Sequence, residues 1–317
     1  MDSSGEGISV AIRMRPLNDR EINGGQSSVF RVRQNVVEQL TKEGQPIEGQ
    51  VYNYNQVFGE AAGNEDVYTG IAKDVVKGVV GGINGTIFAY GQTSSGKTHT
   101  MLGGGSEPGV LEMAATEIFD RISQCDNREF LMRVSFVEIY NELIYDLLCD
   151  SKDDALINIR EDPRRGVYCE ATEKIITDYE SITKSLHRGM SRRTVESTAM
   201  NETSSRSHSI FKLVVESRER PSEGSDEPDG AVLVASLTLV DLAGSESVKH
   251  TQAAGQRAKE GGKINQSLLS LSRVIHSLSQ PGAHVAYRDS KLTRLLQPSL
   301  SGNAKMCIVC CVTSAEK

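Results

Sequence analysis

A glycine-rich segment that ends in a lysine and a threonine is the clearest candidate for chemistry in this sequence. Gly91 to Thr98 read GQTSSGKT and follow the apolar segment INGTIFAY. The order G-x-x-x-x-G-K-[ST], after a strand and before a helix, is the pattern of a phosphate-binding loop. Glycines let backbone N–H groups converge on phosphate oxygens, Lys97 reaches the β- and γ-phosphates, and Thr98 is placed to hold Mg²⁺. A plain turn before a helix would require neither of these two residues.

An apolar strand that ends in a carboxylate supplies the second part of such a site. The run LTLV is followed by DLAGSE, from Asp241 to Glu246. Asp241 can hold Mg²⁺ through water, and Gly244 can offer its backbone N–H to a γ-phosphate. Alone, D-x-x-G describes many strand-to-loop turns. Downstream of a phosphate loop, it predicts a nucleotide hydrolase.

A polar cluster lies between these two segments. It reads NETSSRSH from Asn201 to His208 and precedes an apolar strand. Its hydroxyls can reach Mg²⁺ and phosphate, and Arg206 can pair with a carboxylate across the site. A solvated loop has the same composition, so the cluster gains its meaning from the two segments around it.

The elements that must position these segments alternate between strands and helices. Strands are expected at residues 8–14, 86–90, 130–140, 207–218, 232–240 and 305–312. Helices are expected at 65–80, from Pro108 to about residue 123, at 256–278, and at 290–297, where Pro298 ends the last one. This alternation predicts an α/β fold. The connector RPSEGSDEPDG reads as an exposed loop, so residues 1–317 are expected to form a single domain.

The composition excludes several classes of protein. No apolar run approaches the roughly 18 residues of a membrane span, and the start MDSSGEG lacks the features of a signal peptide, which predicts a cytosolic or nuclear protein. The formal net charge of −7 argues against a protein that coats nucleic acid. Cys307, Cys310 and Cys311 lie in MCIVCCV, which reads as a buried strand of reduced thiols. A redox or zinc pair at Cys307 and Cys310 is the less favoured alternative, because no second pair or histidine cluster accompanies it.

Taken together and in this order, the three polar segments resemble the kinesin motor domain. GQTSSGKT is similar to its phosphate loop, NETSSRSH to its switch I, and DLAGSE to its switch II. The segment Arg13-Met-Arg15-Pro16 is similar to the kinesin R-x-R-P adenine contact, and VEIYNELIYDLL, KEGGKINQSLLSLSRVI and YRDSKLTRLLQPSLSGN extend the resemblance over about residues 8–315. The resemblance implies the kinesin motor fold, a mostly β central sheet of the P-loop nucleotide hydrolase kind with helices on both faces. The stretch from FKLVVESRER onward most resembles the centromere-associated kinesins, although GQTSSGKTHTM is equally similar to conventional kinesin.

The resemblance also implies roles for the matching residues. The residues assigned to ATP are Arg13, Arg15, Pro16, Gly91, Gln92, Thr93, Ser94, Ser95, Gly96, Lys97, Thr98 and His99, with Arg13, Pro16 and His99 at the adenine. Thr98 and Ser205 would hold Mg²⁺, with Asp241 acting through water. Arg206 and Glu246 would form a gate over the γ-phosphate and, with Asn201 and Gly244, order the attacking water. The implied cofactors are ATP or ADP and Mg²⁺, and the implied activity is ATP hydrolysis stimulated by microtubules.

Three basic groups are candidates for contact with the microtubule. The first contains Tyr287, Arg288, Lys291 and Arg294, a segment that kinesins dock on tubulin together with the long helix before it. The second, after switch II, contains Lys249, His250, Arg257, Lys259 and Lys263, and the third contains Arg164 and Arg165. Lys291 and Arg294 are three apart and share a helix face. A solvated helix face is the alternative for each group, but an acidic chain needs such local patches to bind an acidic polymer.

The resemblance also implies properties of the whole protein. It implies a plus-end-directed motor on cytoplasmic microtubules, the spindle among them, that dimerises through a stalk and has no nucleic-acid or membrane partner. Kinesins continue past the last strand into a helix and a neck linker, which we expect to lie outside residues 1–317.

A GTPase is disfavoured because no N-K-x-D motif follows D-x-x-G, and a protein kinase because G-x-G-x-x-G and H-R-D are missing. A microtubule-binding module with a decayed nucleotide site would not retain Lys97, Thr98, Arg206, Gly244 and Glu246.

Overall fold

The computed structural model describes residues 7–41, 43–151, 154–163, 166–199, 205–220, 231–246, 256–280, 282–301 and 304–315, with only the backbone for 194–199 and 256–260. The main-sheet strands are β1 (Ile8–Arg15), β5 (Gln56–Phe58), β6 (Asn84–Tyr90), β9 (Arg128–Tyr140), β10 (Leu143–Asp146), β11 (Leu156–Ile157), β14 (Lys174–Ile176), β15 (Ser207–Glu219), β16 (Leu233–Asp241) and β17 (Ala304–Thr313). The shorter strands are β2 (Phe30–Arg33), β3 (Val36–Leu40), β4 (Pro46–Asn53), β7 (Gly103–Gly104), β8 (Glu107–Pro108), β12 (Ile159–Asp162) and β13 (Gly166–Cys169).

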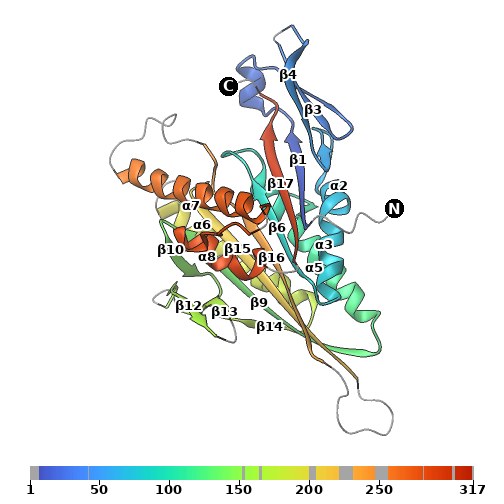
Figure 1. Cartoon of the computed structure of the whole chain (residues 1–317), viewed down its shortest axis with the longest axis vertical. Helices are drawn as coiled ribbons and strands as arrows, with labels where there is room; N and C mark the ends of the chain where they lie inside the picture. The colour runs from blue at the N-terminus through green and yellow to red at the C-terminus, as the bar shows by residue number, and fades with distance from the viewer. Residues whose placement is uncertain are drawn as a thin grey trace.

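A ten-stranded mixed sheet forms the centre of the molecule (Figure 1). Its order is β11-β10-β9-β15-β16-β6-β17-β1-β5, with β14 paired to β9. Strands β16, β6, β17 and β1 run parallel, whereas β15 is antiparallel to both β16 and β9. The parallel strands are rich in consecutive apolar residues because helices cover both of their faces.

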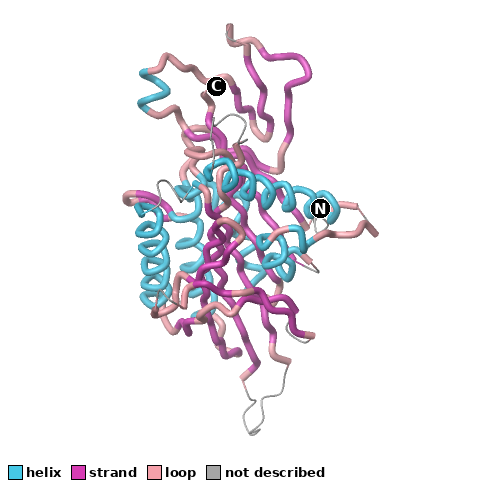
Figure 2. Tube along the Cα trace, turned by 90° about the vertical axis from the view of Figure 1, so that its left-hand side faces the viewer, coloured by secondary structure: helices cyan, strands magenta, loops and turns pink. Residues whose placement is uncertain are grey.

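Helices cover both faces of the sheet, as Figure 2 shows. One face carries α2 (Asn64–Val67), the π-helical turn η1 (Tyr68–Ala72), α3 (Lys73–Val80), α5 (Val110–Ser123) and α6 (Tyr179–Ala199); the other carries α7 (Gln256–Leu278) and α8 (Lys291–Leu300). Val76, Ile118 and Ile182 belong to the apolar core of the first face, and Leu268 and Leu296 to that of the second. Short helices α1 (Asp19–Asn23), α4 (Lys97–Leu102) and η4 (Tyr287–Asp289) complete the fold. The prediction of an α/β sheet flanked on both faces is confirmed.

The prediction that Pro298 ends the last helix is wrong. Helix α8 continues to Leu300 with Pro298 inside it. Proline lacks the N–H that would bond the carbonyl of Arg294, but in the last turn of a helix only one such bond is lost. Leu296 and Leu300 remain buried in the core beneath α8, and this burial outweighs that loss.

Strand β17 explains the three clustered cysteines. Cys307 and Cys310 are three positions apart on a strand, so their side chains point to opposite faces of the sheet. Burial raises the pKa of the Cys307 thiol to about 12 and that of Cys310 to about 11. They are therefore packing residues rather than a metal or redox pair, and all six cysteines are free thiols.

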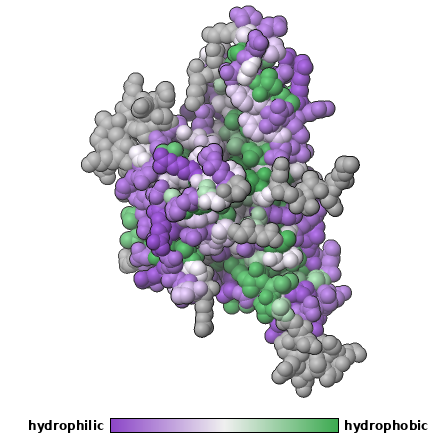
Figure 3. Space-filling view, viewed as in Figure 1, coloured by the Kyte–Doolittle hydropathy of each residue, from purple (hydrophilic) through white to green (hydrophobic). Residues whose placement is uncertain are grey.

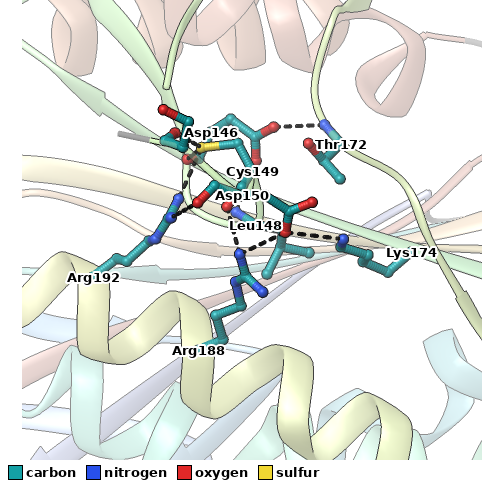
Figure 4. A network of polar contacts seen from close by, with 9 residues as sticks. Asp146, Leu148, Cys149, Asp150, Thr172, Lys174, Arg188 and Arg192 are labelled. Atoms are coloured by element: carbon teal, nitrogen blue, oxygen red, sulfur yellow. Dashed lines mark hydrogen bonds and ion pairs between the residues drawn. The ribbon is translucent and has the colours of Figure 1, made fainter. Parts of the chain in front are cut away.

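Helix α6 is fastened to the segment after β10 by two arginines (Figure 4). Arg188 donates hydrogen bonds to the carbonyl of Cys149 at 2.7 Å and to Asp150 at 2.9 Å. Arg192 donates to the Cys149 sulfur at 2.8 Å. These contacts fix the helix that brings the next residue, Arg193, into the interior.

The surface is hydrophilic over much of one face of the molecule and has exposed apolar side chains near the start of β16. Figure 3 shows hydrophilic side chains over much of the face that carries α7 and α8. Leu233 and Val234 at the start of β16, and Val232 just before it, are exposed. Within the described part of the chain, no helix is long and apolar enough to cross a membrane.

Candidate functional site

The carboxyl ends of β6 and β16 bring two of the polar sequence segments together. These strands are parallel, and Asp241 at the end of β16 pairs with Ala89, just before the phosphate loop. Strand β15 begins at the same edge, with Ser209 opposite Asp241. Ligands bind outside the carboxyl ends of the parallel strands in sheets of this kind. The topology therefore places the phosphate loop, the end of switch I and the start of switch II at one site.

The phosphate loop has a backbone that requires glycine at its start. Gly91 has φ of 151°, and a Cβ atom there would overlap the carbonyl oxygen of Cys311 in β17. Lys97 is 6% exposed and donates from Nζ to the carbonyl of Gln92 at 2.8 Å. Burial lowers the pKa of Lys97, and the nearby Asp241 and Glu246 oppose that shift. Its ammonium group is thus held directly over the loop.

Oxygen atoms suited to Mg²⁺ meet at Asp241. Thr98 donates from Oγ1 to Asp241 Oδ2 at 2.8 Å. Within the described residues, Asp241 Oδ1 and Ser95 Oγ are buried and have no hydrogen-bond partner. Mg²⁺ prefers hard oxygen ligands, keeps several of its waters and needs few protein ligands. The hydroxyl, the carboxylate and the unsatisfied oxygens therefore fit a hydrated Mg²⁺ ion beside a phosphate.

A buried arginine joins this centre, and the sequence motifs did not reveal it. Arg193 of α6, 5% exposed, donates to Asp241 Oδ2 at 2.8 Å and lies 3.6 Å from a carboxylate oxygen of Glu138 in β9. Ser207 donates its hydroxyl to the same Glu138 oxygen. Arg193 thus links α6 to the carboxylate expected to serve Mg²⁺.

Switch II lies directly against the phosphate loop. Glu246 accepts the backbone N–H of Thr93 at 2.8 Å and also its hydroxyl. Burial raises the pKa of Glu246, but the hydrogen bonds from Thr93 and the charge of Lys97 outweigh it and lower the pKa overall. Glu246 is therefore an ionised carboxylate aimed at the loop that would hold the phosphates.

Switch I and switch II are also joined through their backbones. Gly244 donates its N–H to the carbonyl of Ser205 at 2.8 Å, and Ser245 donates to that of Gly91 at 3.1 Å. The N–H that Gly244 is expected to offer to a γ-phosphate therefore has a protein partner in this structure. The two switches and the phosphate loop form one hydrogen-bonded assembly.

Gly244→Ala is expected to lower ATP turnover by about a hundredfold, because reacting groups tolerate little misplacement. A Cβ atom at Gly244 would overlap the Thr93 hydroxyl and the Glu246 carboxylate. The added methyl group must therefore move Glu246 away from Thr93. Steady-state hydrolysis measures the effect, with Gly59→Ala as the control, since a Cβ at Gly59 meets nothing within 4 Å. Equal turnover in the two variants would contradict the close approach.

The residues expected at the adenine are placed in different surroundings. Arg13 is buried and donates to Asn64 and, at 2.6 Å, to Thr100. Arg15 donates to the carbonyl of Ser94 in the phosphate loop at 2.7 Å and pairs with Glu21. Pro16 is exposed, and His99 lies 3.5 Å from Glu107. Arg13 and Arg15 therefore also brace the loop and α4, and their contact with adenine stays a prediction.

Four of the residues expected at the microtubule come together around α8. Tyr287 and Arg288 lie on η4, and Lys291 and Arg294 on the first turns of α8. Lys263 on α7 donates to the carbonyl of Asn141 at 3.4 Å. Helix α7 includes Arg257 and Lys259, whose side chains lie outside the described residues, as do Asn201, Lys249, His250, Arg164 and Arg165. The gate between Arg206 and Glu246 also stays a prediction.

An acidic residue that the sequence did not single out lies among these basic side chains. Glu161 of β12 accepts hydrogen bonds from Arg288 at 3.0 Å and from Arg294 at 3.2 Å. One carboxylate thus holds two arginines of the expected binding face. The basic runs along the chain drew attention to the arginines but not to their distant partner.

Comparisons with known proteins show the family to which this chain is similar. A family model described as the kinesin motor domain matches residues 13–317. Centromere-associated protein E of Homo sapiens is 45% identical over 96% of this chain and 11% of its own length, and kinesin-like protein KIN-7N of Arabidopsis thaliana is 44% identical over 98% of this chain and 37% of its own. A solved structure described as a fast kinesin superposes with a TM-score of 0.86 at 35% identity, over 97% of this chain and 86% of that one.

This chain spans less than half the length of these two curated relatives. The family match nevertheless covers residues 13–317, and it confirms the resemblance found in the sequence. The chain therefore belongs to the kinesin motor-domain family, whose members are microtubule-dependent ATPases.

Proposed function

We propose that residues 1–317 form one motor domain in which ATP hydrolysis, with Mg²⁺, is coupled to changes in microtubule affinity. The observation that carries this proposal is the bond between Glu246 and Thr93. The Thr93 N–H belongs to the loop that binds phosphate, whereas Glu246 belongs to switch II. A phosphate that takes this N–H releases Glu246, so occupancy of the site changes the position of switch II.

We give the other residues the roles that the resemblance implies. Lys97 exchanges the carbonyl of Gln92 for the phosphates, and Thr98 and Ser205 offer hydroxyls to Mg²⁺, with Asp241 acting through water. Bound Mg²⁺ supplies positive charge that offsets the charge on the phosphate oxygens. Glu246, once released, and Gly244 hold the attacking water together with Asn201 and Arg206.

For the whole protein we propose plus-end-directed movement on cytoplasmic microtubules, with dimerisation through a stalk outside these residues. The family membership supports microtubules as the partner, and we propose no nucleic-acid or membrane partner. The human relative is named for the centromere, which suggests the spindle as one location. A plant kinesin-like protein is nearly as similar, at 44% identity over 98% of this chain.

Steady-state ATP hydrolysis with and without polymerised microtubules, at low salt, tests the proposal. We expect stimulation of about tenfold or more, a usual size for coupling between two binding sites. GTP in place of ATP is expected to support slower turnover. Hydrolysis that microtubules leave unchanged would remove the track from the proposal and leave an ATPase with another partner.

Glu161→Gln is expected to raise microtubule affinity about two- to fivefold at low salt, the range given by exposed ion pairs. The change frees Arg288 and Arg294 from a competing carboxylate and makes the binding face more positive. Co-sedimentation over a series of salt concentrations should also show a steeper salt dependence. Glu170→Gln is the matched control, because Glu170 pairs with the exposed Arg160 at 3.1 Å. An unchanged affinity would indicate that these arginines do not face the polymer.

A further inference from the structure

A fully enclosed histidine joins the two switches to helix α7. His208, 2% exposed, is the second residue of β15 and pairs with Ile139 of β9. Its Nδ1 accepts the backbone N–H of Ala243 in switch II at 3.0 Å. Its Nε2 lies 2.8 Å from the hydroxyl of Ser267 on α7. One rigid ring thus contacts both switch II and the long helix α7.

The directions of these hydrogen bonds are fixed by their chemistry. A backbone N–H can only donate, so Nδ1 carries a lone pair and the proton of the neutral ring is on Nε2. Nε2 therefore donates to Ser267, whose own hydroxyl donates to the carbonyl of Ile264 at 2.7 Å. The chain runs without a gap from Ala243 through His208 and Ser267 to Ile264.

The charge state of the ring is fixed as well. Burial, with Arg193 and Lys97 nearby, lowers the pKa of His208 to about 3. A protonated ring would turn a second N–H toward Ala243 and break the first bond of the chain. His208 stays neutral around physiological pH, so the chain is a permanent connection and not a pH switch.

This series of hydrogen bonds lies in an apolar core, where it can fix the position of α7 in a way that apolar packing cannot. Ala243, Ile264 and Leu268 belong to the apolar core between α7 and the sheet. Apolar contacts are non-directional, so on their own they do not specify one register of a helix against its neighbour. A buried polar pair specifies one register, because a shift leaves its donors and acceptors unsatisfied.

We propose that His208 and Ser267 form a positioning relay that makes α7 follow the backbone of switch II, and that the relay sets how strongly nucleotide state changes microtubule affinity. The inference rests on the proposed function and deepens it by naming the contact. Ala243 directly precedes Gly244, which is bound to Ser205, so a switch movement that starts at the phosphates displaces the Ala243 N–H. Helix α7 carries basic residues expected at the microtubule, Lys263 among them.

Ser267→Ala removes the acceptor of the relay while leaving the catalytic residues in place. Microtubule dissociation constants are measured with ADP and with a slowly hydrolysed ATP analogue. We expect the ratio of these two dissociation constants in Ser267→Ala to be closer to one than in wild type, by a factor of about five or more. Turnover in the absence of microtubules should stay within about twofold of wild type. Ser267→Thr keeps the hydroxyl and should keep the ratio. Ser270→Ala removes another buried serine of α7 and should also keep it.

Two histidine variants break the relay from the side of His208, one at Ser267 and the other at Ala243. His208→Asn retains an acceptor for Ala243 but is too short to reach Ser267, whereas His208→Gln reaches Ser267 but loses the acceptor. Both are expected to move the ratio of dissociation constants toward one, as Ser267→Ala does. They test the relay if Ser267→Ala fails to fold.

The possible results separate the relay from the proposed function. A wild-type chain without microtubule-stimulated turnover overturns the proposed function itself. A stimulated wild type with an unchanged ratio in Ser267→Ala overturns the relay alone, and so does an equal loss in Ser270→Ala. A loss in Ser267→Ala that Ser267→Thr restores supports it.

Discussion

Glu246→Ala is expected to reduce ATP turnover by about 10²–10⁴-fold, the range for loss of a positioned acid–base group. The carboxylate is ionised and held on Thr93, at the loop where the γ-phosphate would lie. Because Lys97 and Thr98 remain, nucleotide binding should change little. Single-turnover hydrolysis and titration with a fluorescent ATP analogue measure the two quantities separately.

Two further variants show whether this loss reflects the carboxylate itself. Glu246→Gln keeps the shape of the side chain and one acceptor for Thr93 but cannot take a proton, so it should be nearly as inactive as Glu246→Ala. Asp120→Ala removes an exposed acid of α5 and should retain wild-type turnover. Near-normal hydrolysis in Glu246→Ala would rule out a catalytic role for this residue.

Much of the nucleotide site could be predicted because its residues are local in sequence. The phosphate loop from Gly91 to Thr98 and the segment from Asp241 to Glu246 each have a pattern that their chemistry requires. The topology then brings them together, since β6 and β16 are parallel neighbours. The expected long strands and the expected helices 65–80 and 256–278 are also present, because each contains either a continuous apolar run or a repeated apolar pattern.

The residues that the sequence did not reveal are those defined by distant partners. Helix α6 has a polar sequence with a weak apolar face, so its sequence predicts neither a helix nor a role for Arg193. Arg193 matters because it meets Glu138 and Asp241, and neither pairing leaves a local pattern. Glu161 beside Arg288 is a second case: the contact joins β12 to η4 across more than a hundred positions of sequence.

Arg193→Met is expected to lower the free energy of unfolding by about 3–5 kcal/mol, the usual effect of removing one partner from a buried ion pair. The substitution takes the cation away from Asp241, 3% exposed, and from Glu138, which is also buried, so two carboxylates lose their compensating charge. Equilibrium unfolding in urea measures the change. Turnover should fall too, because Asp241 would no longer be held beside Thr98.

The neighbouring arginine provides a matched control for this prediction. Arg192→Met removes a cation from the same helix, but Arg192 contacts the sulfur of Cys149 and the carbonyl of Asp150 rather than a buried carboxylate (Figure 4). Its loss should therefore cost about 1 kcal/mol, as for an ordinary hydrogen bond. Arg193→Lys keeps the charge without the planar fork and should fall between the two. If Arg193→Met were no more destabilising than Arg192→Met, the carboxylates at the centre of the site would not depend on Arg193 for their charge compensation, and the buried network would have to be neutral or hydrated.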